Sequence, residues 1–127
     1  MRAAVISCGA WGTALAVSLC RNGHEVTLWV HKADRVRPME ETRHNPRLPG
    51  VILPETLNIS SDPACAADCD LVVIASPSYP IRSVCRQVAP FLREDAVVVS
   101  VTKGLEAGTH LRMSQVLAQE TNKEVVV

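Results

Sequence analysis

The stretch that decides the fold is Val5-Ile6-Ser7-Cys8-Gly9-Ala10-Trp11-Gly12-Thr13-Ala14-Leu15-Ala16, close to the start of the chain. An apolar run ends here in a glycine-containing turn, and small and aliphatic residues follow at once, up to Cys20. This order predicts a strand over residues 3–6, a tight turn and then a helix. Asn22-Gly23 predict the end of that helix, because helices commonly end with a glycine in the left-handed backbone conformation.

The turn has features of a site for a phosphate group. Gly9 has no Cβ, so the backbone can lie against a ligand there, and Gly12 would allow the helix to pack closely on the strand. The first turn of the helix carries unpaired N–H groups and the positive end of the helix dipole, which suit a pyrophosphate. The dinucleotide fingerprint G-x-G-x-x-G is incomplete, because Ser7 stands at its first glycine. An ordinary glycine-rich turn between strand and helix is the alternative interpretation.

The composition excludes several classes of protein. The 127 residues suffice for one domain, and 13 basic residues balance 13 acidic ones, so no general attraction to nucleic acid or anionic membranes is expected. Aromatic residues make up 3%, too few for the stacking platforms of single-strand nucleic-acid binders. The 5 cysteines lack C-x-x-C spacing, and we expect buried thiols in a reducing compartment rather than a metal site.

The amino terminus imitates a secretory signal, because Met1-Arg2 precede an apolar stretch that reaches Cys20. Gly9, Trp11 and Gly12 interrupt this stretch, and it is shorter than the roughly 20 residues that a membrane span needs. We therefore interpret it as a buried strand and helix, and we expect a cytoplasmic protein.

Strands and helices alternate along the rest of the chain. Further strands are expected over residues 25–30, 57–60 (at an edge), 71–75, 96–101 and 125–127. Helical segments are expected from near Pro38 with Met39 buried, from Asp62-Pro63 to residue 67, over 80–92 with a kink or end near Val88 before Pro90, and over 111–119. This alternation predicts an α/β fold with a doubly wound parallel sheet, Rossmann-like and three-layered.

The residues with special chemistry follow the carboxyl ends of the predicted strands, the edge at which open α/β sheets bind ligands. His31 and Lys32 follow the second strand, where the adenosine ribose of a dinucleotide is expected. A cation there matches the 2′-phosphate of NADP, whereas an acid accepts from the 2′-hydroxyl of NAD. The nearest acid, Asp34, comes slightly later, so the local charge favours NADP without excluding NAD. A solvated loop is the alternative interpretation.

Five stretches together point to one family: Gly9-Ala10-Trp11-Gly12-Thr13-Ala14-Leu15-Ala16, Asn22-Gly23-His24-Glu25-Val26-Thr27-Leu28-Trp29, Leu53-Pro54-Glu55-Thr56-Leu57, Ala75-Ser76-Pro77-Ser78 and Thr102-Lys103-Gly104-Leu105-Glu106. In their order and spacing they resemble bacterial NAD(P)-dependent glycerol-3-phosphate dehydrogenase. The W-G-T-A-L-A and T-K-G-[IL]-E segments distinguish this family from other dinucleotide enzymes.

The resemblance implies reversible hydride transfer between NAD(P)H and dihydroxyacetone phosphate, giving sn-glycerol 3-phosphate for phospholipid synthesis. In such enzymes the residues matching Ala10 and Trp11 contact the cofactor phosphates, and those matching His31 and Lys32 lie at the adenosine end. The lysine matching Lys103 contacts cofactor and substrate, although an exposed loop lysine is the alternative. The full candidate cofactor-binding set is Gly9, Ala10, Trp11, Gly12, His31, Lys32, Ser76, Pro77 and Lys103, with Lys103 also proposed for the substrate.

The chain departs from the family pattern at several positions. Ser7 replaces the first glycine, Ala10 stands where a serine is common, and His31 stands where an arginine is usual. The segment 45–49 lacks the tyrosine often found before Leu-Pro. These departures concern cofactor affinity and the preference for NADP, and they leave the predicted fold unchanged.

The family pattern continues beyond the position of Val127 into a Gly-Pro-Ser-Phe loop and an all-helical domain with the catalytic lysine. We therefore expect residues 1–127 to be a dinucleotide-binding domain with no catalytic residue and no metal, which binds NADP or NAD without turnover. The complete enzyme is expected to be a homodimer, with neither nucleic acid nor membrane as a partner. The alternatives are a stand-alone dinucleotide-binding or sensing module, or another enzyme with this amino-terminal fold, such as a ketopantoate reductase or a hydroxyacid dehydrogenase.

Overall fold

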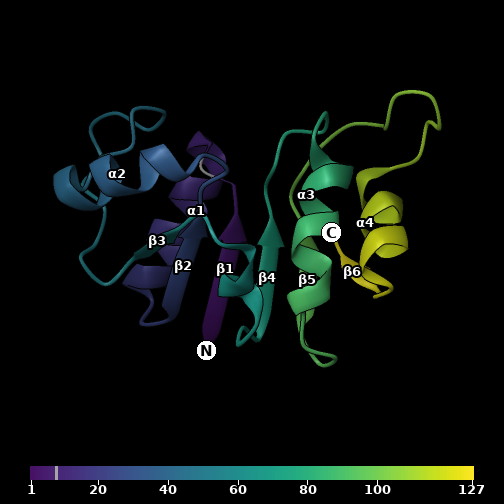
Figure 1. The fold of residues 1–127 in the computed structure, drawn as a ribbon, viewed down its shortest axis with the longest axis horizontal. Helices are drawn as coiled ribbons and strands as arrows, with labels where there is room; N and C mark the ends of the chain where they lie inside the picture. Colours follow the sequence, from purple (N-terminus) through teal and green to yellow (C-terminus); the bar gives the residue numbers. More distant parts are fainter. Residues whose placement is uncertain (8) are drawn as a thin grey trace.

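The computed structural model describes residues 1–7 and 9–127, and these residues form a six-stranded sheet flanked by helices (Figure 1). The strands are β1 Arg2–Ile6, β2 Glu25–Trp29, β3 Asn58–Ser60, β4 Leu71–Ile74, β5 Val97–Ser100 and β6 Val125–Val126. The α-helices are α1 Ala10–Arg21, α2 Val36–Thr42, α3 Ile81–Val88 and α4 Met113–Thr121. Short 3₁₀ turns are η1 Ala33–Arg35, η2 Pro63–Ala66 and η3 Ala89–Phe91.

The strands pair in parallel in the order β3-β2-β1-β4-β5-β6. In Figure 1 they lie side by side in this order, from β3 on the left to β6 on the right. The chain first builds outward from β1 through β2 to β3, and then crosses back to continue at β4 on the other side of β1. This is a doubly wound sheet, so the predicted Rossmann-like fold is confirmed, and all carboxyl ends of the strands lie at one edge.

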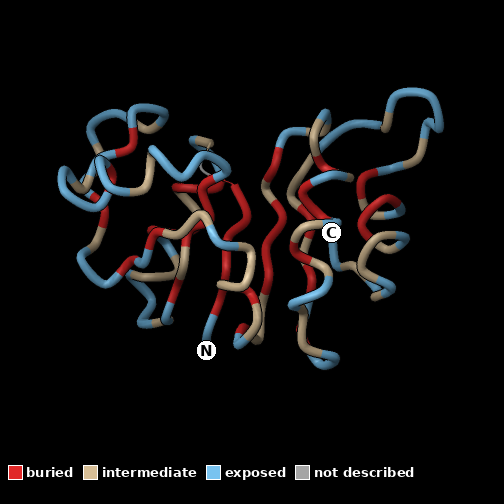
Figure 2. Tube along the Cα trace, in the orientation of Figure 1, coloured by how far each residue is buried: buried red, intermediate tan, exposed pale blue. Residues whose placement is uncertain are grey.

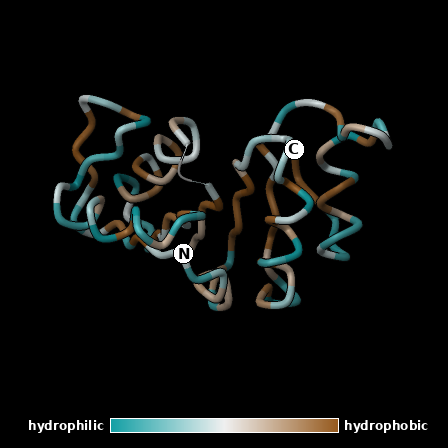
Figure 3. The backbone as a smooth tube through the Cα atoms, turned by 45° about the horizontal axis from the view of Figure 1, so that its top comes forward, coloured by the Kyte–Doolittle hydropathy of each residue, from teal (hydrophilic) through white to brown (hydrophobic). Residues whose placement is uncertain are grey.

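The sheet has a hydrophobic core on each face, which makes three layers. In β1, Ala4 and Ile6 pack with residues of α3 and α4, whereas Val5 packs with residues of α1 and α2. Because neighbours along a strand point to opposite faces, an unbroken apolar run is expected where both faces are covered. The strands in the middle of the molecule are largely buried in Figure 2 and largely hydrophobic in Figure 3.

Several local predictions are confirmed. Gly23 has a φ of 85° and supplies the left-handed residue after α1. Met39 is 2% exposed and is the buried residue of α2. Helix α3 ends at Val88, and the following turn η3 contains Pro90 at its second position, where a proline removes no helical hydrogen bond.

Two helix starts differ from the prediction. Helix α2 begins at Val36, before Pro38, which still lies in the first turn, where its missing N–H is not needed. Helix α4 begins at Met113 rather than at residue 111, because an isolated antiparallel bridge between Leu105 and Arg112 holds the preceding backbone extended. Over residues 1–7 and 9–127, every helix is too short or too polar to cross a lipid bilayer.

The prediction that the strand over residues 96–101 is buried on both faces is wrong for β5. Val98 is fully buried, whereas Val97 is 47% exposed. In β6, Val126 is 52% exposed and pairs with Val99, so the exposed side chains share one face. The reason is that α1 and α2 pack over the β1–β3 half of this face, and no helix among residues 1–7 and 9–127 covers its β5–β6 part.

Candidate functional site

The turn between β1 and α1 forms the first part of the site. Gly9 is the N-cap of α1, with a φ of −66° and a ψ of 173°, and its carbonyl accepts the N–H of Thr13 at 3.0 Å. By the geometry of an α-helix, the N–H groups of residues 10–12 have no partner within the helix. They lie at the carboxyl end of β1, so the positive end of the helix dipole is at the edge where a ligand is expected.

The two glycines of this turn have different roles. A Cβ at Gly12 would lie 2.8 Å from the carbonyl oxygen of Ser7 and 3.3 Å from the Cβ of Ala75, which confirms that Gly12 allows close packing of helix and strand. At Gly9 an added Cβ would meet only the Oγ of Ser7, at 3.6 Å, which is an ordinary contact. The packing around position 9 therefore does not require a glycine, and the missing Cβ leaves the backbone there open to a ligand.

Ser7 makes the sharp turn that the first glycine of the fingerprint normally makes. Its φ is 153°, in a region that L-residues rarely adopt. Its hydroxyl accepts a hydrogen bond from the N–H of Gly9 at 3.2 Å. The departure from the fingerprint thus has a structural consequence, because this side chain engages one backbone N–H of the turn.

The carboxyl ends of β4 and β5 are tied together by a threonine. The hydroxyl of Thr102 donates to the carbonyl oxygen of Ser76 at 2.6 Å, and it also lies 3.4 Å from the carbonyl oxygen of Ile74. Ser76 is 4% exposed. This contact fixes the backbone immediately before Pro77 and before Lys103, so the two segments keep a constant position at the edge of the sheet.

The segment that carries Lys103 is also anchored further along. Gly104 has a φ of 112°, which glycine adopts freely. Glu106 accepts two hydrogen bonds of 2.7 Å from Arg82 of α3 and one of 2.7 Å from the hydroxyl of Thr109. The contact with Arg82 is the main reason that the pKa of Glu106 falls to about 2. The side chain of Lys103 is exposed, but its backbone is held between the contact of Thr102 with Ser76 and the contact of Glu106 with Arg82.

A cavity of about 250 Å³, which we call the Lys103 cavity, brings the turn and this segment together. Its lining residues are Ser7, Gly9, Ala10, Trp11, Gly12, Ala75, Ser76, Pro77, Ser78, Val101, Thr102 and Lys103. The first turn of α1 and Lys103 therefore border the same volume, and the positive charge of both favours an anion there.

A second cavity of about 440 Å³, which we call the His31 cavity, continues along the same edge. Its lining residues are Ser7, Gly9, Trp29, His31, Lys32, Arg35, Arg47, Ser76, Pro77, Pro80 and Val84. The ring of His31 contacts Trp29 edge to face, with centroids 5.7 Å apart. The indole N–H of Trp29 donates to the carbonyl of Ser61 at 3.1 Å, so this wall is fixed to the segment after β3.

All candidate cofactor-binding residues from the sequence line one or both cavities, and the two cavities share Ser7, Gly9, Ser76 and Pro77. The topology explains this result, because parallel strands bring their carboxyl ends to one edge. Sequence reasoning missed Thr102, Arg35 and Arg47. Thr102 could have been found from its place beside Lys103, and Arg47 from its place directly before Leu48-Pro49, where the family often has a tyrosine.

A buried polar contact holds the segment that carries Arg47. The Nδ2 of Asn45 donates to the Oγ1 of Thr13 at 2.7 Å, and these two residues are 1% and 0% exposed. The Oδ1 of Asn45 accepts the N–H of Arg47 at 3.0 Å. Buried side-chain amides are normally hydrogen-bonded in this way, and the pairing docks the segment onto α1.

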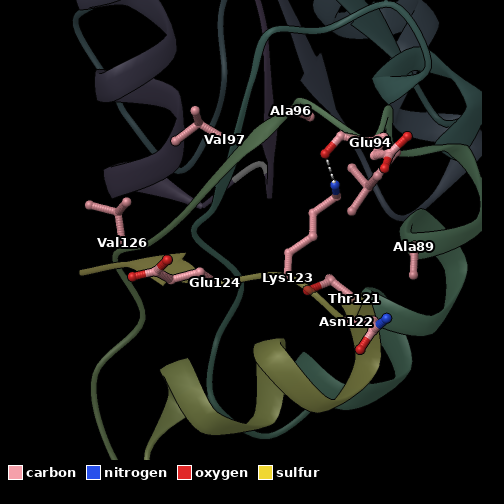
Figure 4. Close-up of a pocket in the computed structure, with 10 residues that line it drawn as sticks. Ala89, Glu94, Ala96, Val97, Thr121, Asn122, Lys123, Glu124 and Val126 are labelled. Carbon is pink, nitrogen blue, oxygen red and sulfur yellow. Dashed lines mark hydrogen bonds between the residues drawn. The ribbon is translucent and has the colours of Figure 1, made fainter.

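A larger cavity of about 650 Å³ lies at the amino ends of β5 and β6, at the opposite edge of the sheet (Figure 4). Lys123 contributes a charge there, but its Nζ donates to the carbonyl oxygen of Glu94 at 2.6 Å, as the dashed line in Figure 4 shows. Ligands of parallel α/β sheets bind at the carboxyl ends of the strands, so we do not assign the site to this cavity.

The described cysteines are free thiols. Burial raises the pKa of Cys85 to about 12 and that of Cys65 to about 11, so both stay protonated and unreactive near neutral pH. The predicted burial of Cys8 concerns a residue outside the described part of the chain. Within residues 1–7 and 9–127, no group of three or more His, Cys, Asp or Glu side chains is arranged to hold a metal ion.

A family model described as the N-terminus of NAD-dependent glycerol-3-phosphate dehydrogenase matches residues 2–127. The chain belongs to this family. A glycerol-3-phosphate dehydrogenase (NAD(P)+) of Teredinibacter turnerae is 44% identical over 122 residues, which cover 94% of the chain and 36% of that protein. The crystal structure of glycerol-3-phosphate dehydrogenase from Coxiella burnetii matches with a TM-score of 0.87 at 32% identity, over 98% of this chain and 38% of that one.

The chain thus spans little more than a third of the length of these relatives. A ketopantoate reductase from Ralstonia eutropha is also similar, with a TM-score of 0.81 at 27% identity, over 98% of this chain and 40% of that one. The two classes share the fold of this domain. The match of the glycerol-3-phosphate dehydrogenase model over residues 2–127 decides between the enzyme families that the sequence left open.

Proposed function

We propose that residues 1–127 are the dinucleotide-binding domain of an enzyme that transfers a hydride between NAD(P)H and dihydroxyacetone phosphate, giving sn-glycerol 3-phosphate. The observation that carries the proposal is the position of Lys103 and the first turn of α1 around one cavity. Membership of the family supports the substrate class. Since the chain corresponds to 36% of a relative such as the Teredinibacter turnerae enzyme, the activity of a complete enzyme is part of the proposal.

The Lys103 cavity fits the anionic centre of a dinucleotide. The backbone N–H groups of residues 10–12 are proposed to donate to the pyrophosphate, and Gly9 allows it to approach the backbone. Lys103 supplies a compact positive charge where a phosphorylated substrate would lie beside the cofactor. The bound nicotinamide supplies the hydride donor or acceptor, and the residues of this domain bind and orient it.

The His31 cavity is proposed to hold the adenosine part of the cofactor. His31 and Lys32 line its outer end after β2, while Ser76 and Pro77 line the part that it shares with the Lys103 cavity. A ligand that occupies both cavities would therefore cross the carboxyl ends of β1 and β4. This is the position at which the strand order reverses and where such sheets bind nucleotides.

Binding and proton transfer are proposed to reside in different parts of the enzyme. Among the described residues that line the two cavities, we assign none to protonation of the substrate carbonyl. The catalytic lysine of this family is proposed to lie outside residues 1–127, so the chain binds cofactor without turnover. The complete enzyme is proposed to be a cytoplasmic homodimer that serves phospholipid synthesis, with neither nucleic acid nor a membrane as a partner.

Titration of the chain with NADPH and NADH, monitored by tryptophan fluorescence, tests the proposed site. Trp11 is 59% exposed and lines the Lys103 cavity, whereas Trp29, which is 2% exposed, lines the His31 cavity, so bound cofactor should quench both tryptophans and Trp29→Phe isolates the signal of Trp11. In Trp11→Phe the quenching should decrease to the part that comes from Trp29, while calorimetry still detects binding. Lys103→Gln should weaken binding by about tenfold, because it removes a charge-assisted contact, and should leave the melting temperature unchanged.

Two results would contradict the proposal. If neither cofactor binds at millimolar concentration, the assignment of a dinucleotide site is wrong. If the purified 127-residue chain reduces dihydroxyacetone phosphate at rates typical of an enzyme, the assignment of proton transfer to another part of the protein is wrong.

A further inference from the structure

We propose that Arg82 is a positioning residue for the Lys103 cavity, which holds Lys103 where its ammonium can reach an anion beside the first turn of α1. The inference rests on the proposed function, because the anion is the phosphate of the ligand assigned to that cavity. Arg82 is not among the described residues that line either cavity, so it acts through Lys103 and not by contact with the ligand.

Two segments line the Lys103 cavity besides the turn before α1. They are residues 75–78, which follow β4, and residues 101–103, which follow β5. Neither segment belongs to a strand or a helix. The position of Lys103 therefore depends on the individual contacts that join the two segments.

The segments approach each other on both sides of Lys103. Before it, the hydroxyl of Thr102 donates to the carbonyl oxygen of Ser76 at 2.6 Å. After it, a Cβ added to Gly104 would lie 3.7 Å from the Cβ of Ser78, which is an ordinary van der Waals distance. Glycine is conformationally permissive, so this second approach does not fix the backbone by itself. The segment needs an anchor beyond Gly104.

Arg82 provides this anchor. Its Nε and Nη2 donate to the two carboxylate oxygens of Glu106, each at 2.7 Å, and such a bidentate pair fixes direction as well as distance. Helix α3 begins at Ile81, soon after Ser78, which lines the cavity. The ion pair thus joins the segment of Lys103 to the helix that continues the other segment of the cavity lining.

The anchor is itself held in place by α4. The Nη1 of Arg82 donates to Glu120 of this helix at 2.7 Å. The side chains of Arg82, Glu106 and Glu120 are partly buried, so solvent and salt weaken their attraction less than that of exposed pairs. The guanidinium therefore keeps one orientation between two helices, and Glu106 is held against it.

The ion pair also leaves the charge of Lys103 available to a ligand. Both carboxylate oxygens of Glu106 accept from Arg82, and Oε1 also accepts from the hydroxyl of Thr109 at 2.7 Å. Over residues 1–7 and 9–127, Lys103 takes part in no ion pair. Without Arg82, the carboxylate of Glu106 would lose its partner three residues from Lys103 and would attract the same ammonium. Loss of Arg82 should therefore weaken anion binding through Lys103.

A double-mutant cycle tests this role, by calorimetric titration of the 127-residue chain with NADPH. Arg82→Gln should weaken binding by about three- to tenfold, because it can remove at most the contribution of Lys103. In the Lys103→Gln background the same change should alter the affinity by less than about twofold, because the residue through which Arg82 acts is absent. A purely structural role would give the same loss in both backgrounds. Arg82→Lys keeps the charge without the bidentate geometry, and its loss should be smaller but of the same kind.

Arg86→Gln is the matched control. Arg86 lies on the same helix and pairs with Glu120 at 3.1 Å, not with Glu106, so its loss should leave the affinity for NADPH unchanged. If Arg82→Gln binds as tightly as the wild type, or weakens binding equally with and without Lys103, the positioning role is wrong and the dinucleotide site is unaffected. An equal loss in Arg86→Gln would also overturn the role, because it would show a general effect of charge.

The melting temperature of each variant is measured beside the titrations. If Arg82→Gln is unfolded at the temperature of titration, the cycle is carried out with Arg82→Lys, and the same two results decide. If the wild-type chain does not bind NADPH, the proposed function is wrong, and this inference is wrong with it.

Discussion

The guanidinium of Arg82 donates two hydrogen bonds of 2.7 Å to the carboxylate of Glu106, and this pair joins α3 to the segment that follows Lys103. Arg82 also donates to Glu120 of α4 at 2.7 Å, and Arg86 donates to the same carboxylate at 3.1 Å. Side-chain exposures of 24% for Arg82, 17% for Glu106 and 14% for Glu120 distinguish this network from an ordinary surface pair. It fixes the segment of Lys103 to two helices.

This network predicts a loss of stability in acid. Contact with Arg82 lowers the pKa of Glu106 from 4.5 to about 2, and it lowers the pKa of Glu120 as well. Because both pKa values are lower in the folded chain than in the unfolded chain, the stabilisation is complete above about pH 4.5. It is lost as the pH falls from there toward about 2, and the melting temperature should decline over this range.

The control for this prediction uses two glutamine variants. Glu106→Gln should lower the melting temperature at pH 7 and reduce the decline in acid, because one of the responsible carboxylates is gone. Glu41→Gln removes an exposed carboxylate that pairs with Arg37 at 2.9 Å, and it should leave both quantities as in the wild type. A decline in Glu106→Gln as steep as in the wild type would show that other groups cause it.

The two glycines of the β1–α1 turn should respond differently to alanine. Gly12→Ala places a Cβ 2.8 Å from a backbone oxygen, so we expect a loss of about 1–3 kcal/mol in the free energy of unfolding, measured with urea. Gly9→Ala should change that free energy by less than about 1 kcal/mol, since its new Cβ makes an ordinary contact. It should nevertheless weaken NADPH binding. The opposite order of stabilities would contradict our assignment of the two roles.

Ser7 offers a test of backbone strain. Its φ of 153° suits glycine, so Ser7→Gly should be more stable than Ser7→Ala by about 1 kcal/mol, although alanine is usually the more stabilising of the two. Both variants lose the hydroxyl that accepts from Gly9, so this contact cancels in the comparison. Urea unfolding of the pair measures the difference. If Ser7→Ala proves the more stable variant, the backbone at this position is not strained.

The buried contact between Asn45 and Thr13 should matter for both stability and cofactor binding. Asn45→Ala leaves the hydroxyl of Thr13 without this partner, and we expect a loss of about 1–3 kcal/mol in unfolding free energy. The same variant releases the segment of Arg47, which lines the His31 cavity, and should weaken the binding of NADPH. Thr13→Val combined with Asn45→Ala should destabilise by less than the sum of the single changes. Additive effects would show that the two side chains act independently.

The edge at which the candidate site residues meet could be predicted because it follows from the order of the elements. Gly9, Lys32, Ser76 and Lys103 are far apart in sequence, yet each follows a different strand of one parallel sheet. The carboxyl ends of such strands meet at one edge, so no knowledge of side-chain positions is needed. The strands themselves follow from apolar runs, since a strand with both faces covered contains few polar residues.

The exposure of β5 could not be predicted in this way. Its apolar run resembles that of β4, but burial depends on whether a helix covers each face, and α1 and α2 cover the other half of one face. The start of α4 is a similar case. The residues before Met113 fit a helical pattern, and the bridge between Leu105 and Arg112 prevents them from joining the helix.

The sequence by itself determined the alternation of strands and helices, the turn at Gly9 and the edge at which a nucleotide would bind. Local periodicity and parallel topology are sufficient for these features. Only the tertiary structure decided that Arg47 joins Lys32 at one cavity, that Asp34 lines another, and that Arg82 anchors the segment of Lys103. These relationships depend on side-chain direction and on contacts between distant parts of the chain, and no local pattern contains that information.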